Sequence, residues 1–188
     1  MVVDPNVYSG PPAETRHPNE MAVYAYLDKL GISYQRCDHE YANTMEDCKA
    51  VEQVLGAPIC KNLLLTNRKQ TDFYLLMMPG DKPFKTRDVT AQLGCARLSF
   101  ATPEHMMELL GAAPGSASAF ELMHDREGKV QLVMDRELME GDFISGHPCF
   151  STSTLKLTRS DFLDRFLPAV GHKPILVDLP WPEPETEA

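Results

Sequence analysis

Apolar residues recur at helical spacing in some segments of the chain and gather into short continuous runs in others. Between Val23 and Leu30 they return every three or four positions, which predicts a helix over Asn19–Leu30. Thr102 followed by Pro103 is typical of a helix start. Similar signals predict helices from Thr44 (a capping box with Asp47) to about Leu55, over Thr86–Leu93, from Thr102 to Leu110 and from Ser160 to Leu167.

Apolar runs bounded by polar residues predict the strands. Lys61–Thr66 and Phe73–Met78 are separated by the polar turn Asn67–Asp72, so they predict a hairpin of buried strands. Further strands are predicted at Ile32–Arg36, Lys129–Met134, Asp142–Gly146, Ser153–Thr158 and Pro174–Asp178. Short strands and helices in irregular order favour a mixed α/β domain over a doubly wound parallel sheet.

The two ends of the chain differ in composition from the part between them. Residues 2–18 are polar and carry four prolines, and residues 180–188 are rich in proline and glutamate. The chain has 188 residues, of which 43% are hydrophobic, enough for one sizeable core. We therefore expect a Pro-rich N-terminal extension (1–18), one folded domain (19–180) and an acidic C-terminal tail (181–188).

The net charge and the spacing of the cysteines argue against non-specific nucleic-acid binders, disulfide-rich proteins and zinc ribbons. The formal net charge is −9, which disfavours a non-specific nucleic-acid binder but allows a local basic surface. Five cysteines without CxxC spacing argue against a disulfide framework or a zinc ribbon and fit a reducing compartment. No apolar run approaches a membrane span and no signal peptide is evident, so a cytoplasmic protein is expected. The basic surface is expected from Arg16, Lys61, Lys82, Lys85, Arg87 and Arg97.

The adjacent residues His147, Pro148 and Cys149 suggest three kinds of site. A zinc site needs three or four ligands, and no second HxH, HxxxH or CxxC pattern supplies the rest. A Cys149 nucleophile needs a nearby base and a lowered pKa. The interpretation that we favour from the residues alone is that Cys149 is a small buried hydrophobic side chain.

Three other segments carry candidate chemistry. In "GAAPGSASAF", Pro114 and Gly115 predict a tight loop whose backbone amides approach a ligand, although the Walker spacing is absent. Lys61 opens an apolar strand, and lysine is rarely buried without a partner. Arg97 interrupts the apolar "CARLSF" and suits either a phosphate contact or a surface ion pair. Alone, the loop and Lys61 are equally compatible with an ordinary turn or strand edge, and for Arg97 the surface ion pair is the commoner case.

The order of the segments is more specific than any one of them. The chain carries, in order, "LDKLGISYQRCDHE", "KNLLLTNRKQTDFYLLMMPGDK", "ARLSFATPEHMMELLGAAPGSASAF", "GDFISGHPCFSTSTLKLT" and "GHKPILVDLP". From about Glu20 to Pro180 this order resembles the YbaK/ProX-type aminoacyl-tRNA deacylases, free-standing relatives of the editing domain of bacterial prolyl-tRNA synthetase. It is most similar to the ProX/PrdX branch, the Ala-tRNA(Pro) deacylases.

The resemblance implies a fold and an activity. The fold is a single α/β domain with a mixed, strongly curved central sheet surrounded by helices. The activity is hydrolysis of the ester that joins a wrong amino acid to tRNA(Pro), with alanine expected and with no cofactor or metal. A hydrophobic pocket separates small side chains by only about 1–3 kcal/mol, so a second hydrolytic site is needed for fidelity.

The resemblance also implies catalytic roles. Lys61 would lie near the 3′-terminal adenosine and orient its phosphate or the ester. The amides of Gly115 and Ser116 would hold the ester carbonyl as the tetrahedral intermediate forms. His147 would line the amino-acid pocket. In the family, water is activated largely by the substrate's own ribose hydroxyl, which agrees with the absence of a Ser/His/Asp or paired-carboxylate pattern in this sequence.

Further positions match the family's pocket and its tRNA-binding surface. Asn62, Pro114 and Pro148 are expected beside the catalytic residues, and Arg97 and Arg16 are expected to contact tRNA. The expected partners are tRNA(Pro) mischarged with alanine or cysteine and prolyl-tRNA synthetase, without a membrane. The sequence leaves open a monomer or a homodimer.

Several alternatives stay open from the sequence. Glu121 stands where many members of the family have Gly, and "FSTST" replaces the commoner "NTAT" or "NTSS". Either departure could reshape the pocket toward Cys-tRNA(Pro) or Ser-charged tRNA. A non-catalytic member that binds tRNA or the synthetase is a second alternative, and a thiol-dependent hydrolase using Cys149 is a third.

Overall fold

The computed structural model describes residues 1–42 and 45–182, and its strands form two sheets that share one core. The antiparallel sheet has the order β1 (Tyr8–Ser9), β2 (Gln35–Asp38), β8 (Ser153–Thr158) and β7 (Phe143–Gly146). The mixed sheet has the order β5 (Leu98–Phe100), β3 (Cys60–Asn67), β4 (Phe73–Pro79), β6 (Val130–Asp135) and β9 (Ile175–Val177). The single-domain α/β prediction is confirmed, with two sheets where one was expected.

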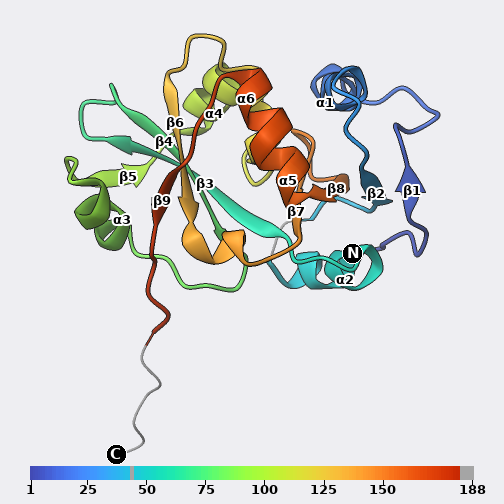
Figure 1. Cartoon of the computed structure of the whole chain (residues 1–188), viewed down its shortest axis with the longest axis horizontal. Helices are drawn as coiled ribbons and strands as arrows, with labels where there is room; N and C mark the ends of the chain where they lie inside the picture. Colours follow the sequence, from blue (N-terminus) through green and yellow to red (C-terminus); the bar gives the residue numbers. More distant parts are fainter. Residues whose placement is uncertain (43–44, 183–188) are drawn as a thin grey trace, which may run out of the picture.

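Helices surround the two sheets (Figure 1). The longer ones are α1 (Pro18–Lys29), α2 (Met45–Leu55), α3 (Thr86–Leu93) and α4 (Pro103–Leu110). Residues 159–170 form one continuous helical segment made of α5 (Arg159–Asp161), the π-turn η3 (Phe162–Phe166) and α6 (Leu167–Val170). Two short 3-10 helices are η1 (Ala119–Met123) and η2 (Arg136–Met139). No helix among the described residues is both long enough and apolar enough to cross a membrane.

The central strands of the mixed sheet are buried on both faces, and this explains their continuous apolar runs. Along β4, Leu75 and Met77 belong to the main core, whereas Leu76 and Met78 point to a second cluster on the opposite face. Side chains alternate between the faces of a strand, so a strand covered on both sides must be apolar throughout. The main core also includes side chains of the antiparallel sheet, α1 and α5–α6, so one core unites the two sheets.

Local signals placed most elements correctly. β3 and β4 form the predicted antiparallel hairpin, with Lys61 opposite Met78. The Thr102 side chain accepts a hydrogen bond from the amide of His105 and starts α4 as predicted. Gly94 ends α3 in the left-handed conformation (φ +61°), which favours glycine.

Other expectations were wrong. Thr158, not Ser160, caps the helix after β8, because its side chain accepts from the amide of Asp161. The strand predicted at Ile32–Arg36 lies at Gln35–Asp38 instead, where it pairs with β8. The predicted capping residue Thr44 lies outside the described residues, although α2 ends at Leu55 as expected.

The N-terminal extension contributes to the fold. β1 pairs with β2, and the backbone of Val3 bridges that of His39. Pro18, placed in the extension by composition, is the first residue of α1. The extension therefore covers the outer edge of the antiparallel sheet.

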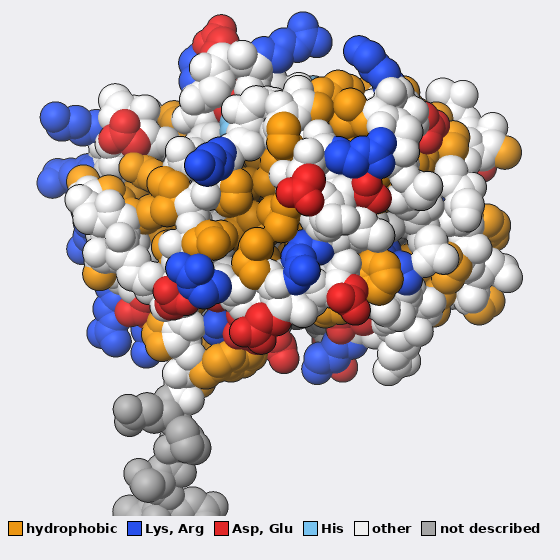
Figure 2. Space-filling view, in the orientation of Figure 1, with side chains coloured by type: hydrophobic (Ala, Val, Ile, Leu, Met, Phe, Trp, Pro, Cys, Tyr) orange, Lys and Arg blue, Asp and Glu red, His pale blue; other side chains and the backbone are white. Residues whose placement is uncertain are grey.

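Lys82 was expected on a basic surface and is instead buried. Its ammonium nitrogen lies 2.7 Å from a carboxylate oxygen of Asp135 and 2.9 Å from one of Glu137. The indole of Trp181 lies over the same ammonium and donates to Glu137. Burial of a lysine is tolerated here because its charge is compensated by carboxylates. On the face in Figure 2, Lys and Arg side chains are interspersed with Asp and Glu around a central apolar area.

Candidate functional site

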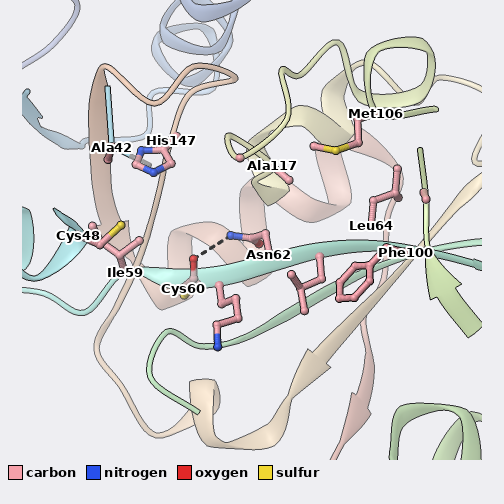
Figure 3. A pocket seen from close by; sticks show the side chains of 14 residues that line it. Ala42, Cys48, Ile59, Cys60, Asn62, Leu64, Phe100, Met106, Ala117 and His147 are labelled. Carbon is pink, nitrogen blue, oxygen red and sulfur yellow. Dashed lines mark hydrogen bonds between the residues drawn. The ribbon is translucent and has the colours of Figure 1, made fainter. Parts of the chain in front are cut away.

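A pocket of about 290 Å³ lies beside the first half of β3, and Figure 3 shows it with β3 along its floor. Segments far apart in the sequence line it: β3, the loop between α4 and η1, and the turn after β7. Four of the residues singled out from the sequence meet here: Lys61, Asn62, Gly115 and His147. The structure therefore brings together residues separated by up to 86 positions in the chain.

The walls of the pocket are mainly apolar. His147 lies near Ala42 and Cys48 at one end, and Phe100 and Met106 lie at the other (Figure 3). Among the described residues that line the pocket there is no Asp or Glu. None of these described lining residues is therefore a carboxylate that could act as a general base.

Lys61 projects from β3 toward the loop that follows β4. Its ammonium donates a hydrogen bond to the carbonyl of Lys82 over 2.8 Å, and two further N–H donors remain for a ligand. Partial burial lowers the pKa of Lys61, while the charge of Asp81 opposes this shift. Lys82 therefore positions Lys61 through its backbone carbonyl, while its own side chain forms an ion pair with Asp135.

Asn62 offers an unpaired acceptor. Its amide nitrogen donates to the carbonyl of Cys60 over 3.0 Å, and its Oδ1 is buried without a hydrogen-bond partner among the described residues. Leaving a buried acceptor unpaired costs about 1–3 kcal/mol. The pocket is therefore suited to a ligand that brings an N–H or O–H donor to this oxygen.

The loop between α4 and η1 is held by a tight turn. Ser116 donates its amide hydrogen to the carbonyl of Ala113 over 3.1 Å, with Pro114 and Gly115 at the central positions and Gly115 at φ +82°. This is the arrangement that Pro-Gly favours in a type II turn. The Tyr41 hydroxyl donates to the Pro114 carbonyl over 2.8 Å and holds the turn from outside.

The amides available in this loop differ from those expected. Ser116 uses its amide within the turn, is fully buried, and accepts the amide of Ser151 on its hydroxyl over 3.1 Å. Within residues 1–42 and 45–182, the amides of Gly115 and Ala117 have no acceptor, and both residues line the pocket. Ala117 has no sequence signal that would single it out, because only the turn geometry distinguishes its amide from that of Ser116.

His147 is buried and neutral. Its Nδ1 lies 3.0 Å from the carbonyl of Ser153, and burial lowers its pKa to about 4. A carbonyl can only accept, so Nδ1 carries the hydrogen and Nε2 keeps its lone pair. Pro148 is buried next to it and does not line the pocket.

Cys149 lies outside the pocket. Its thiol is fully buried, 3.8 Å from Nε2 of His124, and burial raises its pKa. A nucleophilic cysteine needs a lowered pKa and access to substrate, so the geometry does not support a thiol mechanism. In the part of the chain that the structure describes, no three His, Cys, Asp or Glu side chains are grouped to hold a metal ion.

If the protein has the deacylase activity that the resemblance implies, Cys149→Ala is expected to change its rate by no more than about threefold, because the thiol does not reach the pocket. Cys37→Ala is the matched control, because the thiol of Cys37 is also buried and lies outside the pocket. Loss of a true nucleophile would lower kcat by more than about a thousandfold in a folded protein, and that result would restore the thiol mechanism. Alkylation is less decisive, because Cys48 and Cys60 line the pocket.

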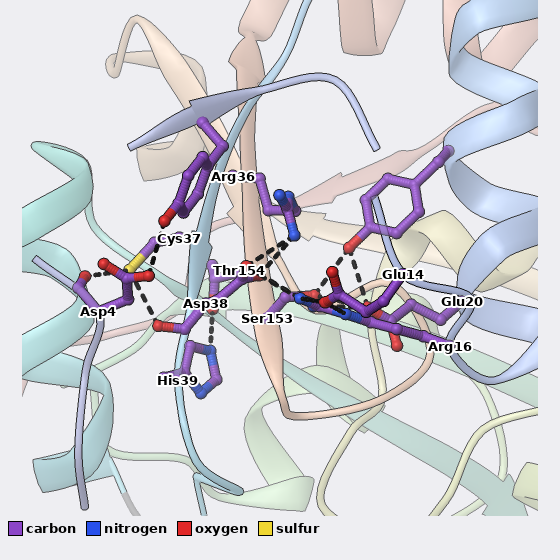
Figure 4. Close-up of polar contacts among 12 residues, drawn as sticks. Asp4, Glu14, Arg16, Glu20, Arg36, Cys37, Asp38, His39, Ser153 and Thr154 are labelled. Atoms are coloured by element: carbon purple, nitrogen blue, oxygen red, sulfur yellow. Dashed lines mark hydrogen bonds and ion pairs between the residues drawn. The ribbon is translucent and has the colours of Figure 1, made fainter. Parts of the chain in front are cut away.

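The two predicted tRNA-binding arginines lie in different surroundings. Arg97 is exposed and lines a second hollow with Lys85 and Arg87. Arg16 lies within 3.3 Å of carboxylate oxygens of Glu14, Glu20 and Asp38, at the edge of the antiparallel sheet (Figure 4). Its charge is compensated within the protein, and this geometry does not favour the expected contact with tRNA.

Comparisons with known proteins agree on one family. The model of the aminoacyl-tRNA editing domain matches residues 39–164. The chain is 32% identical over 157 residues to prolyl-tRNA synthetase associated domain-containing protein 1 of Xenopus laevis, covering 81% of this chain and 92% of that one. It is 28% identical over 153 residues to prolyl-tRNA editing protein ProX of Acetoanaerobium sticklandii, covering 81% and 93%.

A solved structure shares the fold. It is described as a candidate trans-editing enzyme for prolyl tRNA synthetase and superposes with a TM-score of 0.65 at 18% identity, covering 88% of this chain and all of that one.

Proposed function

Because the chain belongs to the aminoacyl-tRNA editing domain family, we propose that it deacylates mischarged tRNA(Pro) in trans, with alanine as the preferred amino acid. One observation carries this proposal: Lys61, Asn62, Gly115 and His147 meet around one apolar pocket that contains both unpaired acceptors and free amides. An ester of a small amino acid needs both kinds of group.

The pocket can bind each part of an aminoacyl ester. The α-ammonium group donates to Oδ1 of Asn62 and Nε2 of His147, which both lack a donor partner. The ester carbonyl accepts from the amides of Gly115 and Ala117, where negative charge develops in the transition state. Lys61 faces a phosphate of the terminal nucleotide as a compact cation.

The reaction is hydrolysis of the ester. A water molecule adds to the carbonyl carbon, the bond to the ribose oxygen breaks, and that oxygen leaves with a proton as a free hydroxyl. With no carboxylate among the described lining residues, the neighbouring ribose hydroxyl of the substrate is the proposed partner of the water. The thiols of Cys48 and Cys60 stay protonated, because burial raises the pKa of each to about 11.

The same contacts favour alanine over proline. The ring of proline leaves two N–H donors on the α-nitrogen instead of three and fixes their directions, so Asn62 Oδ1 and His147 Nε2 are both paired only if both remaining donors point at them. Correctly charged Pro-tRNA(Pro) is therefore spared in this proposal.

The acceptor end of the tRNA is proposed to cross Phe100. Its ring is 60% exposed and lines both the pocket and the neighbouring hollow that contains Arg97, Lys85 and Arg87. An exposed aromatic ring beside cations suits a single-stranded nucleic acid, because bases stack on the ring while phosphates meet the charges. This supports the predicted tRNA contact of Arg97.

Arg97→Ala is expected to raise KM for Ala-tRNA(Pro) about fivefold with little change in kcat, because a phosphate contact contributes binding rather than chemistry. The slope of log(kcat/KM) against log of the salt concentration should become shallower by about one. Arg126→Ala, an exposed arginine outside both hollows, is the control. An unchanged KM and salt slope would remove Arg97 from the tRNA surface.

The function is tested by deacylation of Ala-tRNA(Pro), Cys-tRNA(Pro), Pro-tRNA(Pro) and Ala-tRNA(Ala). Rapid release of alanine from tRNA(Pro) alone is the expected result. Faster release of cysteine would keep the reaction and change the preferred amino acid. No release from any of the four would contradict a deacylase and favour a non-catalytic member that binds tRNA or the synthetase.

A further inference from the structure

Hydrogen bonds connect His147, which follows β7, to Thr154 of β8 and from there to His39, which follows β2. Nε2 of His39 lies 2.9 Å from Oγ1 of Thr154, and this hydroxyl oxygen lies 3.2 Å from Nδ1 of His147. The two imidazole rings are 5.6 Å apart. Figure 4 shows His39 and Thr154 side by side on adjacent segments. His39 lines a surface hollow beside the N-terminal residues and not the pocket, so it reaches the pocket only through Thr154 and its ring contact with His147.

Backbone carbonyls fix the two histidines at the ends of this hydrogen-bonded row of side chains. Nδ1 of His39 lies 2.8 Å from the carbonyl of Glu40, and Nδ1 of His147 lies 3.0 Å from that of Ser153. Carbonyls only accept, so each Nδ1 carries a hydrogen. Neutral His39 then has a lone pair on Nε2, and the Thr154 hydroxyl must donate to it. The oxygen of Thr154 is left to accept from Nδ1–H of His147.

The remaining neighbour of His147 does not change this assignment. Oγ of Ser151 lies 3.5 Å from Nε2 of His147, but it donates its hydrogen to the carbonyl of Ala42 over 2.8 Å. Ser151 thus has no second hydrogen to give. The lone pair of Nε2 stays available to the pocket.

We propose that His39 is a positioning residue that acts through Thr154 to hold His147 in the tautomer whose Nε2 accepts hydrogen bonds from the substrate. Without an acceptor at His39, the Thr154 hydroxyl can turn and donate to Nδ1 of His147 in competition with the Ser153 carbonyl, which would populate the tautomer with the hydrogen on Nε2. A hydrogen on Nε2 would repel the substrate ammonium. The tautomer follows from the structure, whereas its consequence for catalysis rests on the proposed function.

Protonation of His39 should disrupt the arrangement, because Nε2 then becomes a donor. Burial lowers the pKa of His39 below its usual value of 6.5, so the neutral form persists at neutral pH and is lost as the pH falls. The charged or titratable groups that face His39 from the surrounding elements are Asp4, Arg16, Asp38, Glu40, Asp47 and His147.

The tautomer is measured by two-bond ¹H–¹⁵N NMR on the full-length protein with ¹⁵N-labelled histidine, His147 being assigned from its missing signals in His147→Asn. At pH 7.5 we expect a protonated Nδ1 and an unprotonated Nε2 in His147. In His39→Ala a mixture of tautomers should appear. A wild-type His147 protonated at Nε2, or a His39→Ala spectrum unchanged at His147, would overturn the proposal, whether or not the protein deacylates tRNA.

Activity gives a second readout through its pH dependence. His39→Gln keeps an acceptor for Thr154 that cannot be protonated, so kcat at pH 7.5 should stay within about threefold of wild type. In the wild type, kcat should fall at acid pH as His39 becomes protonated. This loss of kcat should disappear in His39→Gln and in Thr154→Val, which lacks the hydroxyl. Thr154→Ser, the matched control, should keep it. Wild-type acid sensitivity in both His39→Gln and Thr154→Val would contradict a role through Thr154.

Discussion

Gly115→Ala is expected to lower kcat for release of alanine from Ala-tRNA(Pro) by about a hundredfold in a protein that still folds. The added methyl group has room, since its nearest neighbour would be the Tyr41 hydroxyl at 3.7 Å. The backbone is the obstacle, because φ is +82° at Gly115 and this left-handed conformation costs alanine about 1–2 kcal/mol. Relief of that strain would move the amides of Gly115 and Ala117 away from the ester carbonyl.

The matched control for this variant is Gly128→Ala. Gly128 also has a positive φ, +64°, with no atom within 4 Å of the added methyl group, and it lies outside the pocket. Both variants should lose similar stability in thermal unfolding, and only Gly115→Ala should lose kcat. Equal kcat in the two variants would mean that the loop does not stabilise the transition state.

Lys61→Ala is expected to lower kcat/KM for Ala-tRNA(Pro) by about 10²–10³, because it removes the only cation among the described residues of the pocket lining that can meet a phosphate of the terminal nucleotide. His147 cannot replace it, since burial lowers its pKa to about 4. Lys61→Arg should recover part of the rate, because it restores the charge but not the shape of a lysine.

Steady-state kinetics with Lys49→Ala as the control separates a local effect from a change in net charge. Lys49 is exposed on α2 and pairs with Glu46. Circular dichroism and thermal unfolding of Lys61→Ala show whether loss of the hydrogen bond to the Lys82 carbonyl disturbs the fold. A folded Lys61→Ala protein with wild-type kcat/KM would exclude Lys61 from the site.

Elements that depend on neighbours in sequence were predictable. The β3–β4 hairpin follows from two apolar runs around a polar turn, and the start of α4 follows from Thr102 and Pro103. Each depends on interactions within a few residues, which local chemistry decides. The order of the segments along the chain resembles that of a family, and this resemblance by itself singles out Lys61, Gly115 and His147.

Other features depend on contacts between segments far apart in the chain. The division into two sheets required β2 to pair with β8, more than a hundred residues later. Lys82 looked like a surface cation, and only the position of Asp135 beside it made burial favourable. The sequence shows which side chains carry a charge, but packing decides whether a charged side chain is buried or in contact with solvent.

The candidate site shows the same division. By itself, the sequence determined the residue types of the proposed site and the local turn that Pro114 and Gly115 favour. The tertiary structure decided which groups are free: the Ser116 amide is used within that turn, whereas the Ala117 amide is not. It also placed His39 against Thr154 across 115 positions. Hydrogen-bond partnership is a property of three-dimensional neighbours, so only the folded chain sets which donors and acceptors remain for a substrate.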